Sequence, residues 1–189
     1  MTLEDRLRRS GEVVRKVAKV EWTRRPEVLM CPQIPKPMHG VAPREILGQR
    51  WWDQTRQAAY RSTAFHCLAC GTWKGVAEYR RWLEGHEWYE IDYCRGRMTY
   101  VECIPLCHLC HSYIHVGRLQ ALLEKGEIHQ AKYVAVLQHG DRVLREAGLR
   151  RPTPYDGPCA EWGRWRLVLE GKEYPPKFET FEAWQKYFS

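Results

Sequence analysis

The sequence lacks any apolar run that approaches the roughly 18 residues needed to span a lipid bilayer. Residues 1–10 are charged and have no apolar core of the kind that a secretory signal peptide carries. Internal repeats and low-complexity tracts are also missing. These absences predict a cytoplasmic protein without a membrane partner.

Eight cysteines in a reducing cytoplasm are expected to serve as metal ligands or buried thiols and not as disulfides. Hydrophobic residues make up 44% of the chain, which is enough for a packed core. The net charge of +7 favours a polyanionic partner, most simply nucleic acid. A merely soluble basic protein is the alternative reading of the charge.

The chain divides by composition into three predicted regions. Residues 1–62 hold a predicted basic amphipathic helix over 3–20 and then a proline-rich linker over 26–43. The helix could lie on a phosphate backbone, or it could pack on the domain with its charged face in solvent. Residues 63–149 hold the chemically informative motifs and a following helix. Residues 150–189 form an aromatic-rich extension.

Several further elements are predicted from periodicity, β-branched and aromatic content, and glycine or proline boundaries. Strands are expected over 82–93 and 97–106, joined by a turn at 94–96, and over 164–169. Helices are expected over 43–62, near 75–82, and over 109–125, 128–147 and 180–187. The fold class is therefore α+β, with mainly helical segments flanking a central hairpin and helix.

Two CxxC pairs predict a structural zinc site. Cys67 and Cys70 precede the predicted hairpin, and Cys107 and Cys110 follow it and open a helix. Each pair puts two sulfurs on one tight turn, and two such pairs can complete a tetrahedral zinc site. Four separately buried thiols or a redox dithiol are weaker readings. A CxxC turn, a hairpin and a second CxxC turn that opens a helix together make a treble-clef arrangement. Zinc would fasten the hairpin to that helix.

Three histidines predict a second metal site. His111 and His115 are four residues apart and so project from one face of a helix, where neutral imidazoles can hold one divalent ion. His86, on the predicted hairpin, can supply a third ligand. Their use as plain surface residues beside a zinc knuckle is the alternative. Cys31 and His39 are a further possible metal pair without a CxxC to support it.

These residues resemble the HNH, or His-Me finger, endonuclease family. A typical family text reads "LEVHHI…NLVLLCRSCHRRIH", and this chain offers LEGHEW at 83–88 and ECIPLCHLCHSYIH at 102–115. The resemblance covers about residues 65–118. It implies a zinc-fastened ββα-metal core, a catalytic divalent ion such as Mg²⁺, and cleavage of phosphodiester bonds.

By this resemblance, His86, His111 and His115 bind the catalytic ion. The position of the general base, a histidine in the family, is occupied by Glu87, and the position of the orienting asparagine is occupied by Glu102. In an alternative register His86 is the base, and Glu84 or Glu87 binds the ion. A glutamate is a weak base at neutral pH because its ordinary pKa is near 4.3.

The expected function is therefore a metal-dependent endonuclease acting on nucleic acid, with DNA as the expected substrate. The alternative is a catalytically degenerate module that binds nucleic acid or a protein partner, as an inhibitor or adaptor. Small basic proteins with an HNH-like centre are often encoded by phages, and such a protein would act in the host cytoplasm. Five arginines near the motifs are expected to bind phosphate groups: Arg80, Arg81, Arg95, Arg97 and Arg118.

Overall fold

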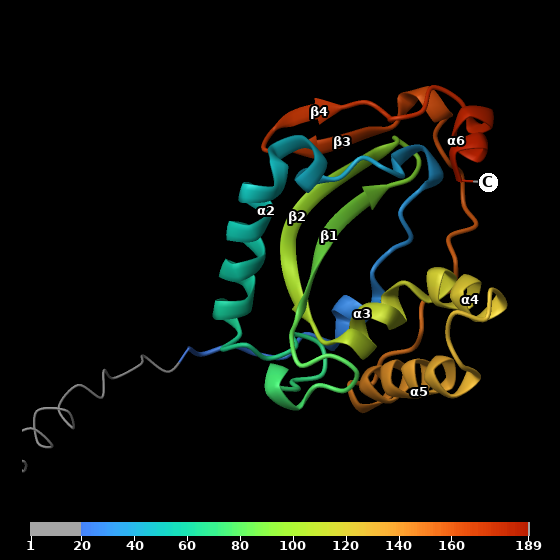
Figure 1. Cartoon of the computed structure of the whole chain (residues 1–189). Helices are drawn as coiled ribbons and strands as arrows, with labels where there is room; N and C mark the ends of the chain where they lie inside the picture. Colours follow the sequence, from blue (N-terminus) through green and yellow to red (C-terminus); the bar gives the residue numbers. More distant parts are fainter. Residues whose placement is uncertain (1–19, 189) are drawn as a thin grey trace, which may run out of the picture.

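The computed structural model describes residues 20–188 and has a mixed α+β fold (Figure 1). The predicted helix over 3–20 falls outside these residues, except for its last position. The described helices are α2 (Pro43–Ser62), α3 (His108–Ile114), α4 (Val116–Glu124), α5 (Gln130–Glu146) and α6 (Phe181–Phe188). The strands are β1 (Glu84–Asp92), β2 (Arg97–Leu106), β3 (Arg166–Leu169) and β4 (Lys172–Tyr174). Short 3-10 helices are η1 (Pro26–Met30), η2 (Lys36–Met38), η3 (Lys74–Val76) and η4 (Trp162–Arg164).

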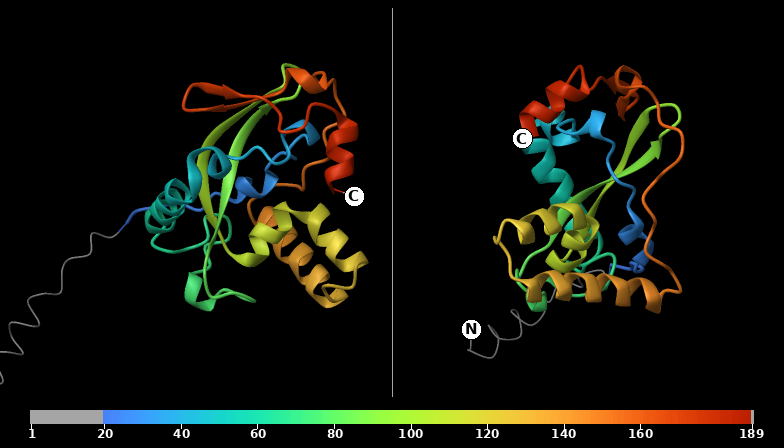
Figure 2. Two further views of the ribbon diagram at one scale, coloured as in Figure 1. Left: turned by 45° about the horizontal axis from the view of Figure 1, so that its top comes forward. Right: turned by 90° about the vertical axis from the view of Figure 1, so that its right-hand side faces the viewer.

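The predicted hairpin forms the centre of the molecule. Strands β1 and β2 pair antiparallel from Glu84 opposite Leu106 to Asp92 opposite Arg97, with one bulge after Trp88. The turn closes because the backbone N–H of Gly96 donates to the carbonyl of Asp92 at 2.9 Å. Gly96 has a φ of +69°, a conformation that glycine adopts without a steric penalty. Helix α2 runs along the hairpin, as two views show (Figures 1 and 2).

The C-terminal region extends the same sheet, in the order β1-β2-β3-β4. Strand β3 lies parallel to β2, with Arg166 opposite Arg97, and β4 returns antiparallel to β3. The strand expected over 164–169 is present as β3, and the helix expected over 180–187 is present as α6, so this flank contains both kinds of element. Strand β4 has only three residues, so its alternating pattern is too short to predict from sequence.

Three predicted helices differ from the structure, the first being α2, which is kinked at Gly48, where φ is +83° and ψ is 169°. Only η3 forms near 75–82, and Tyr79 there has a φ of +63°, which no α-helix accommodates. The helix expected over 109–125 is divided at His115, whose φ of −93° and ψ of 40° are not helical. Gly117, which has low helix propensity, lies just beyond the break.

The buried side chains form two hydrophobic clusters. The first surrounds the CxxC turns and joins η1, β2, α3 and α5, with Val28, Ile104, Leu106, Leu109, Val136 and Leu144 among its buried members. The second joins η2, the hairpin and β3, and it contains Met38, Tyr89, Met98, Trp165, Leu167 and Leu169. The first cluster therefore contains the two CxxC motifs.

Within residues 20–188, none of the helices combines the length and apolarity that crossing a membrane requires.

Two helical glycines give a matched test of how tightly α3 and α5 pack. A Cβ at Gly140 in α5 would lie 2.1 Å from the ring of Tyr113, whereas a Cβ at Gly117 in α4 would meet nothing within 4 Å. We expect Gly140→Ala to lower the free energy of unfolding by about 1–3 kcal/mol through overpacking. Gly117→Ala should raise it by up to about 1 kcal/mol through helix propensity. Denaturant unfolding of both variants checks this, and stabilisation by Gly140→Ala would contradict the packing.

Candidate functional site

The first CxxC turn is built by backbone hydrogen bonds. The N–H of Cys67 donates to the carbonyl of Thr72, and the N–H of Gly71 donates to the carbonyl of Cys67, both at 2.9 Å. Gly71 has a φ of +80°, and a Cβ there would lie 2.8 Å from Cδ of Arg24. The positive φ favours glycine directly after Cys70, whereas the exposed side chain of Arg24 could move to admit a Cβ.

The second CxxC turn is formed by the start of α3. The N–H of His111 donates to the carbonyl of Cys107 at 2.9 Å, so this cysteine precedes the first helical turn and Cys110 lies within it. Strand β2 ends at Leu106, directly before the turn. The hairpin and helix α3 are therefore joined through the cysteine pair itself.

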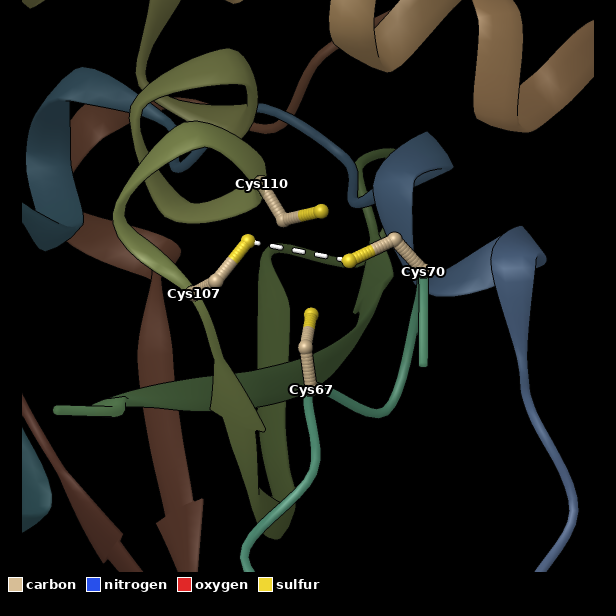
Figure 3. A group of neighbouring side chains, drawn as sticks. All are labelled: Cys67, Cys70, Cys107 and Cys110. Carbon is tan, nitrogen blue, oxygen red and sulfur yellow. Dashed lines mark hydrogen bonds between the residues drawn. The ribbon is translucent and has the colours of Figure 1, made fainter. Parts of the chain in front are cut away.

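The two turns meet, as the sequence predicted. The sulfur atoms of the four cysteines all lie within 4.8 Å of one another (Figure 3). Cys67, Cys107 and Cys110 are buried, and Sγ of Cys70 is 3.7 Å from Sγ of Cys107. Figure 3 shows the sulfur atoms directed towards a common centre. This cluster can hold one metal ion.

The electrostatics of the four sulfurs also fit a cation. Hydrogen bonds from Cys107 and Cys110 hold the pKa of Cys70 well below its ordinary value. Hydrogen bonding to Cys107 and Cys67 raises the pKa of Cys110 well above its ordinary value. Without a cation the cluster can thus ionise only in part, because buried thiolates repel one another and lack water. A divalent ion would allow all four to be thiolates.

Two further side chains contact the sulfurs, and the first is the hydroxyl of Thr72, which lies 3.2 Å from Sγ of Cys70. Nε2 of His139, on α5, lies 3.2 Å from Sγ of Cys110. Its other ring nitrogen lies 3.4 Å from a guanidinium nitrogen of Arg142, so Nδ1 acts as the acceptor and Nε2 carries the proton. His139 therefore donates towards the sulfur of Cys110. Sequence reasoning missed this contact, because the partner lies on a separate helix.

The three predicted histidines also come together. One ring nitrogen from each of His86, His111 and His115 lies within 4.8 Å of the others. The ring centroid of His86 lies 5.4 Å from that of His111 and 4.9 Å from that of His115. His86 comes from β1, and the other two come from the end of α3. The spacing of four residues and the hairpin position were sufficient to predict this group.

Burial keeps two of these imidazoles neutral. Burial, followed by the nearby His115 and His111, holds the pKa of His86 well below its ordinary value. Burial and the nearby His111 and Arg118 lower the pKa of His115 to about 4. Neutral imidazole is the form that binds metal, so at neutral pH no proton has to leave these rings for an ion to enter.

Glu84 positions His111. Its Oε2 lies 3.0 Å from Nδ1 of His111, and its Oε1 lies 2.7 Å from Nδ1 of His108. Burial disfavours the charge of Glu84, but hydrogen bonds from His108 and His111 outweigh it and hold its pKa below the ordinary value. A nitrogen that faces a carboxylate carries a proton, which leaves Nε2 of His111 free to bind metal. The sequence analysis names Glu84 only as a possible metal ligand, in the register in which His86 is the base, and not as a partner of His111.

The two glutamates carried over from the family differ in their surroundings. Glu87 lies in the wall of a cleft beside the histidines, and its buried Oε1 has no hydrogen-bond partner among the described residues. The nearest cation is Arg44, whose Nε is 3.9 Å from that oxygen. Glu102 instead accepts a hydrogen bond of 2.6 Å from Arg25. The expected role of Glu102 in orienting the base is not supported, because its carboxylate already pairs with Arg25.

The five predicted phosphate-binding arginines do not form one group. Arg80 and Arg118 line a cavity of about 170 Å³ beside His111 and His115, and Arg81 follows Arg80 as an exposed residue. Arg95 and Arg97 belong to the turn at the opposite end of the hairpin, where they pair with Asp92 and Glu173. The structure therefore brings Arg80 and Arg118 to the histidines and places Arg95 and Arg97 away from them. Arg95 and Arg97 are close to the motifs only in sequence, because β1 and β2 place the turn between them at the far end of the hairpin.

A larger cleft of about 650 Å³ also borders the histidines, and His115 and Arg118 line both cavities. Its walls are the proline-rich segment (residues 31–42), strand β1 and the junction of α3 and α4, and His86, Glu87 and His115 line it. Lys36 and Arg44 also line the cleft. The sequence did not single them out for the site, because they belong to segments outside the recognisable motif.

The possible metal pair of Cys31 and His39 does not form. Sγ of Cys31 lies 3.5 Å from Nε2 of His86, and burial raises the pKa of this thiol to about 12. Nε2 of His39 bonds the carbonyl of Ile34 at 3.1 Å, and its Nδ1 accepts a hydrogen bond from Trp184. Both nitrogens of His39 are therefore occupied.

The described site thus comprises a four-cysteine cluster, a three-histidine cluster supported by Glu84, and a basic cleft next to the histidines. We compared the chain with protein-family models, curated proteins and solved structures, and no match was found in any of the three.

Proposed function

We propose that the protein is a metal-dependent endonuclease of the HNH type, in which the four cysteines bind a structural zinc ion and the three histidines bind a catalytic divalent ion. The observation that carries the proposal is the meeting of His86, His111 and His115 beside a basic cleft. Mg²⁺ is one candidate for the catalytic ion, and imidazole ligands suit transition metals as well.

Zinc suits the four-cysteine cluster because four thiolates on two tight turns are the usual ligands of a structural zinc site. A hairpin that leads through the second turn directly into α3 is the order of elements in a treble clef and in a ββα-metal module. We infer that zinc binding fixes α3 against the hairpin and so fixes the distance between the imidazoles of α3 and His86.

The bound divalent ion would polarise the phosphodiester and stabilise the negative charge that develops on its oxygens. The imidazoles of His86, His111 and His115 would hold this ion, with His111 oriented by Glu84. Arg118 lines both cavities and pairs with no carboxylate in residues 20–188, so it is placed to bind a phosphate oxygen of the substrate strand. Glu87 lines the cleft with its side chain 15% exposed, so its carboxylate can accept the proton of the attacking water.

A second candidate function is a binding module that has kept the metal sites and lost turnover. Two observations favour it: the base position holds a glutamate, and the carboxylate of Glu102 pairs with Arg25 instead of orienting a base. Such a module would bind nucleic acid through the same basic residues. Cleavage assays separate the two candidates directly.

We expect the purified protein to hold one tightly bound zinc ion per chain in elemental analysis. Cys107→Ser should lose this ion and much of the folded structure, because its sulfur lies at the junction of β2 and α3. The matched control is Cys159→Ser, since Cys159 is exposed and lies outside the cluster. Full thermal stability of Cys107→Ser, or an absence of zinc from the folded protein, would contradict the structural site.

We expect the protein to cleave or nick DNA in the presence of Mg²⁺ or Mn²⁺, as followed by gel electrophoresis of a plasmid and of labelled oligonucleotides. His111→Ala should reduce the rate to background, because an imidazole ligand of the ion is removed. His129→Ala is the control, since His129 is exposed and belongs to neither cluster. Absence of cleavage of duplex DNA, single-stranded DNA and RNA with every divalent ion would reject the enzyme and favour the binding module.

We expect Glu84→Gln to weaken divalent-ion binding at the histidines by roughly 10- to 100-fold, because an amide orients the His111 ring less strongly than a carboxylate. Glu102→Gln should leave this affinity unchanged, since Glu102 pairs with Arg25. Titration of the zinc-loaded protein with Mn²⁺ or Co²⁺ measures both. Equal affinities in the two variants would show that Glu84 does not position His111.

A further inference from the structure

The cleft beside the histidines has a floor of buried side chains. Three side chains from different elements line it and are almost fully buried, namely Met38 of η2, Tyr89 of β1 and Met98 of β2. Its volume of about 650 Å³ exceeds what one metal ion and its water ligands would occupy. The cleft therefore has room for an organic group next to the metal-binding histidines.

Charge complementarity indicates that this group belongs to an anion. Three basic side chains line the cleft, Lys36, Arg44 and Arg118, against the single carboxylate of Glu87. Phe188 also lines it and is 53% exposed, which offers an aromatic face at the rim. A flat apolar body joined to a phosphate matches this combination of apolar floor, aromatic rim and surrounding cations, and a nucleotide has that chemistry.

We propose that the cleft receives an unpaired base of a nucleic-acid strand, whose phosphate lies at Arg118 and His115, and that the preferred substrate is therefore single-stranded. In a duplex the base would first have to leave its stack and its pair, which costs free energy that an unpaired strand does not spend. The inference rests on the proposed nuclease for the bond that is cut, but base binding can be measured without cleavage.

The first experiment measures binding by zinc-loaded His111→Ala protein, so that cleavage cannot remove the probe. Fluorescence anisotropy compares a labelled single strand of about 12 nucleotides, the same strand in a duplex, and a single strand in which the bases are replaced by abasic sites. We expect the intact single strand to bind at least tenfold more tightly than either of the others. Equal or tighter binding of the duplex, or full affinity for the abasic strand, would overturn the proposal.

A second experiment blocks the cleft. Gly117 is exposed, lines the cleft, and has open space around the position of a Cβ, so Gly117→Trp places an indole at the cleft without a clash at Cβ. Gly163→Trp is the matched control, because Gly163 is also exposed with open space at its Cβ but does not line the cleft. We expect a tenfold or greater loss of single-strand affinity for Gly117→Trp alone, with unchanged circular dichroism in both.

The two proposals fail in different ways. Selective single-strand binding by a protein that cleaves nothing would reject the nuclease and leave the base-binding cleft standing. Cleavage of duplex DNA by a protein whose single-strand affinity is unaffected by Gly117→Trp would reject the cleft proposal and leave the nuclease standing.

Discussion

Four sulfur atoms from two distant turns must share one small volume, and the arrangement of the site depends on this constraint. The turn at Cys67 and Cys70 precedes the hairpin, and the turn at Cys107 and Cys110 follows it, so their meeting closes the whole segment between them. The surrounding residues are apolar and buried, with Ile104 among them. Four thiolates cannot be stable in such surroundings without a cation, since their mutual repulsion is not screened by water.

This constraint extends to the histidines because they lie on the same elements as the sulfurs. His111 directly follows Cys110 on α3, and His86 lies opposite Ile104 on the neighbouring strand. The break at His115 then turns the chain away, so that Arg118 on α4 lies beside the same rings and contributes to lowering the pKa of His115. The positions of the three histidines therefore depend on the position of the four cysteines, because only a few residues of α3 and the hairpin separate the two clusters.

The sequence predicted what is local and missed what the fold brings in from elsewhere. The CxxC spacing, the four-residue spacing of His111 and His115, and the hairpin are all determined by neighbouring residues, and each is present in the structure. Arg44 could not be predicted as a cleft residue, because its position depends on how α2 packs against the hairpin. The structural role of Glu84 was missed for a similar reason, since a carboxylate two residues before His86 gives no sign of which imidazole it will meet.

The C-terminal region belongs to the site as much as to the sheet. Trp184 of α6 donates its indole N–H to Nδ1 of His39 at 3.1 Å, and Nε2 of His39 donates to the carbonyl of Ile34. This arrangement requires neutral His39, and burial lowers its pKa in the direction that maintains it. One wall of the cleft, the proline-rich segment, is therefore fixed to α6 by a histidine that uses both of its ring nitrogens. Residues that lie outside the CxxC and histidine motifs consequently determine the shape of the cavity next to the three-histidine cluster.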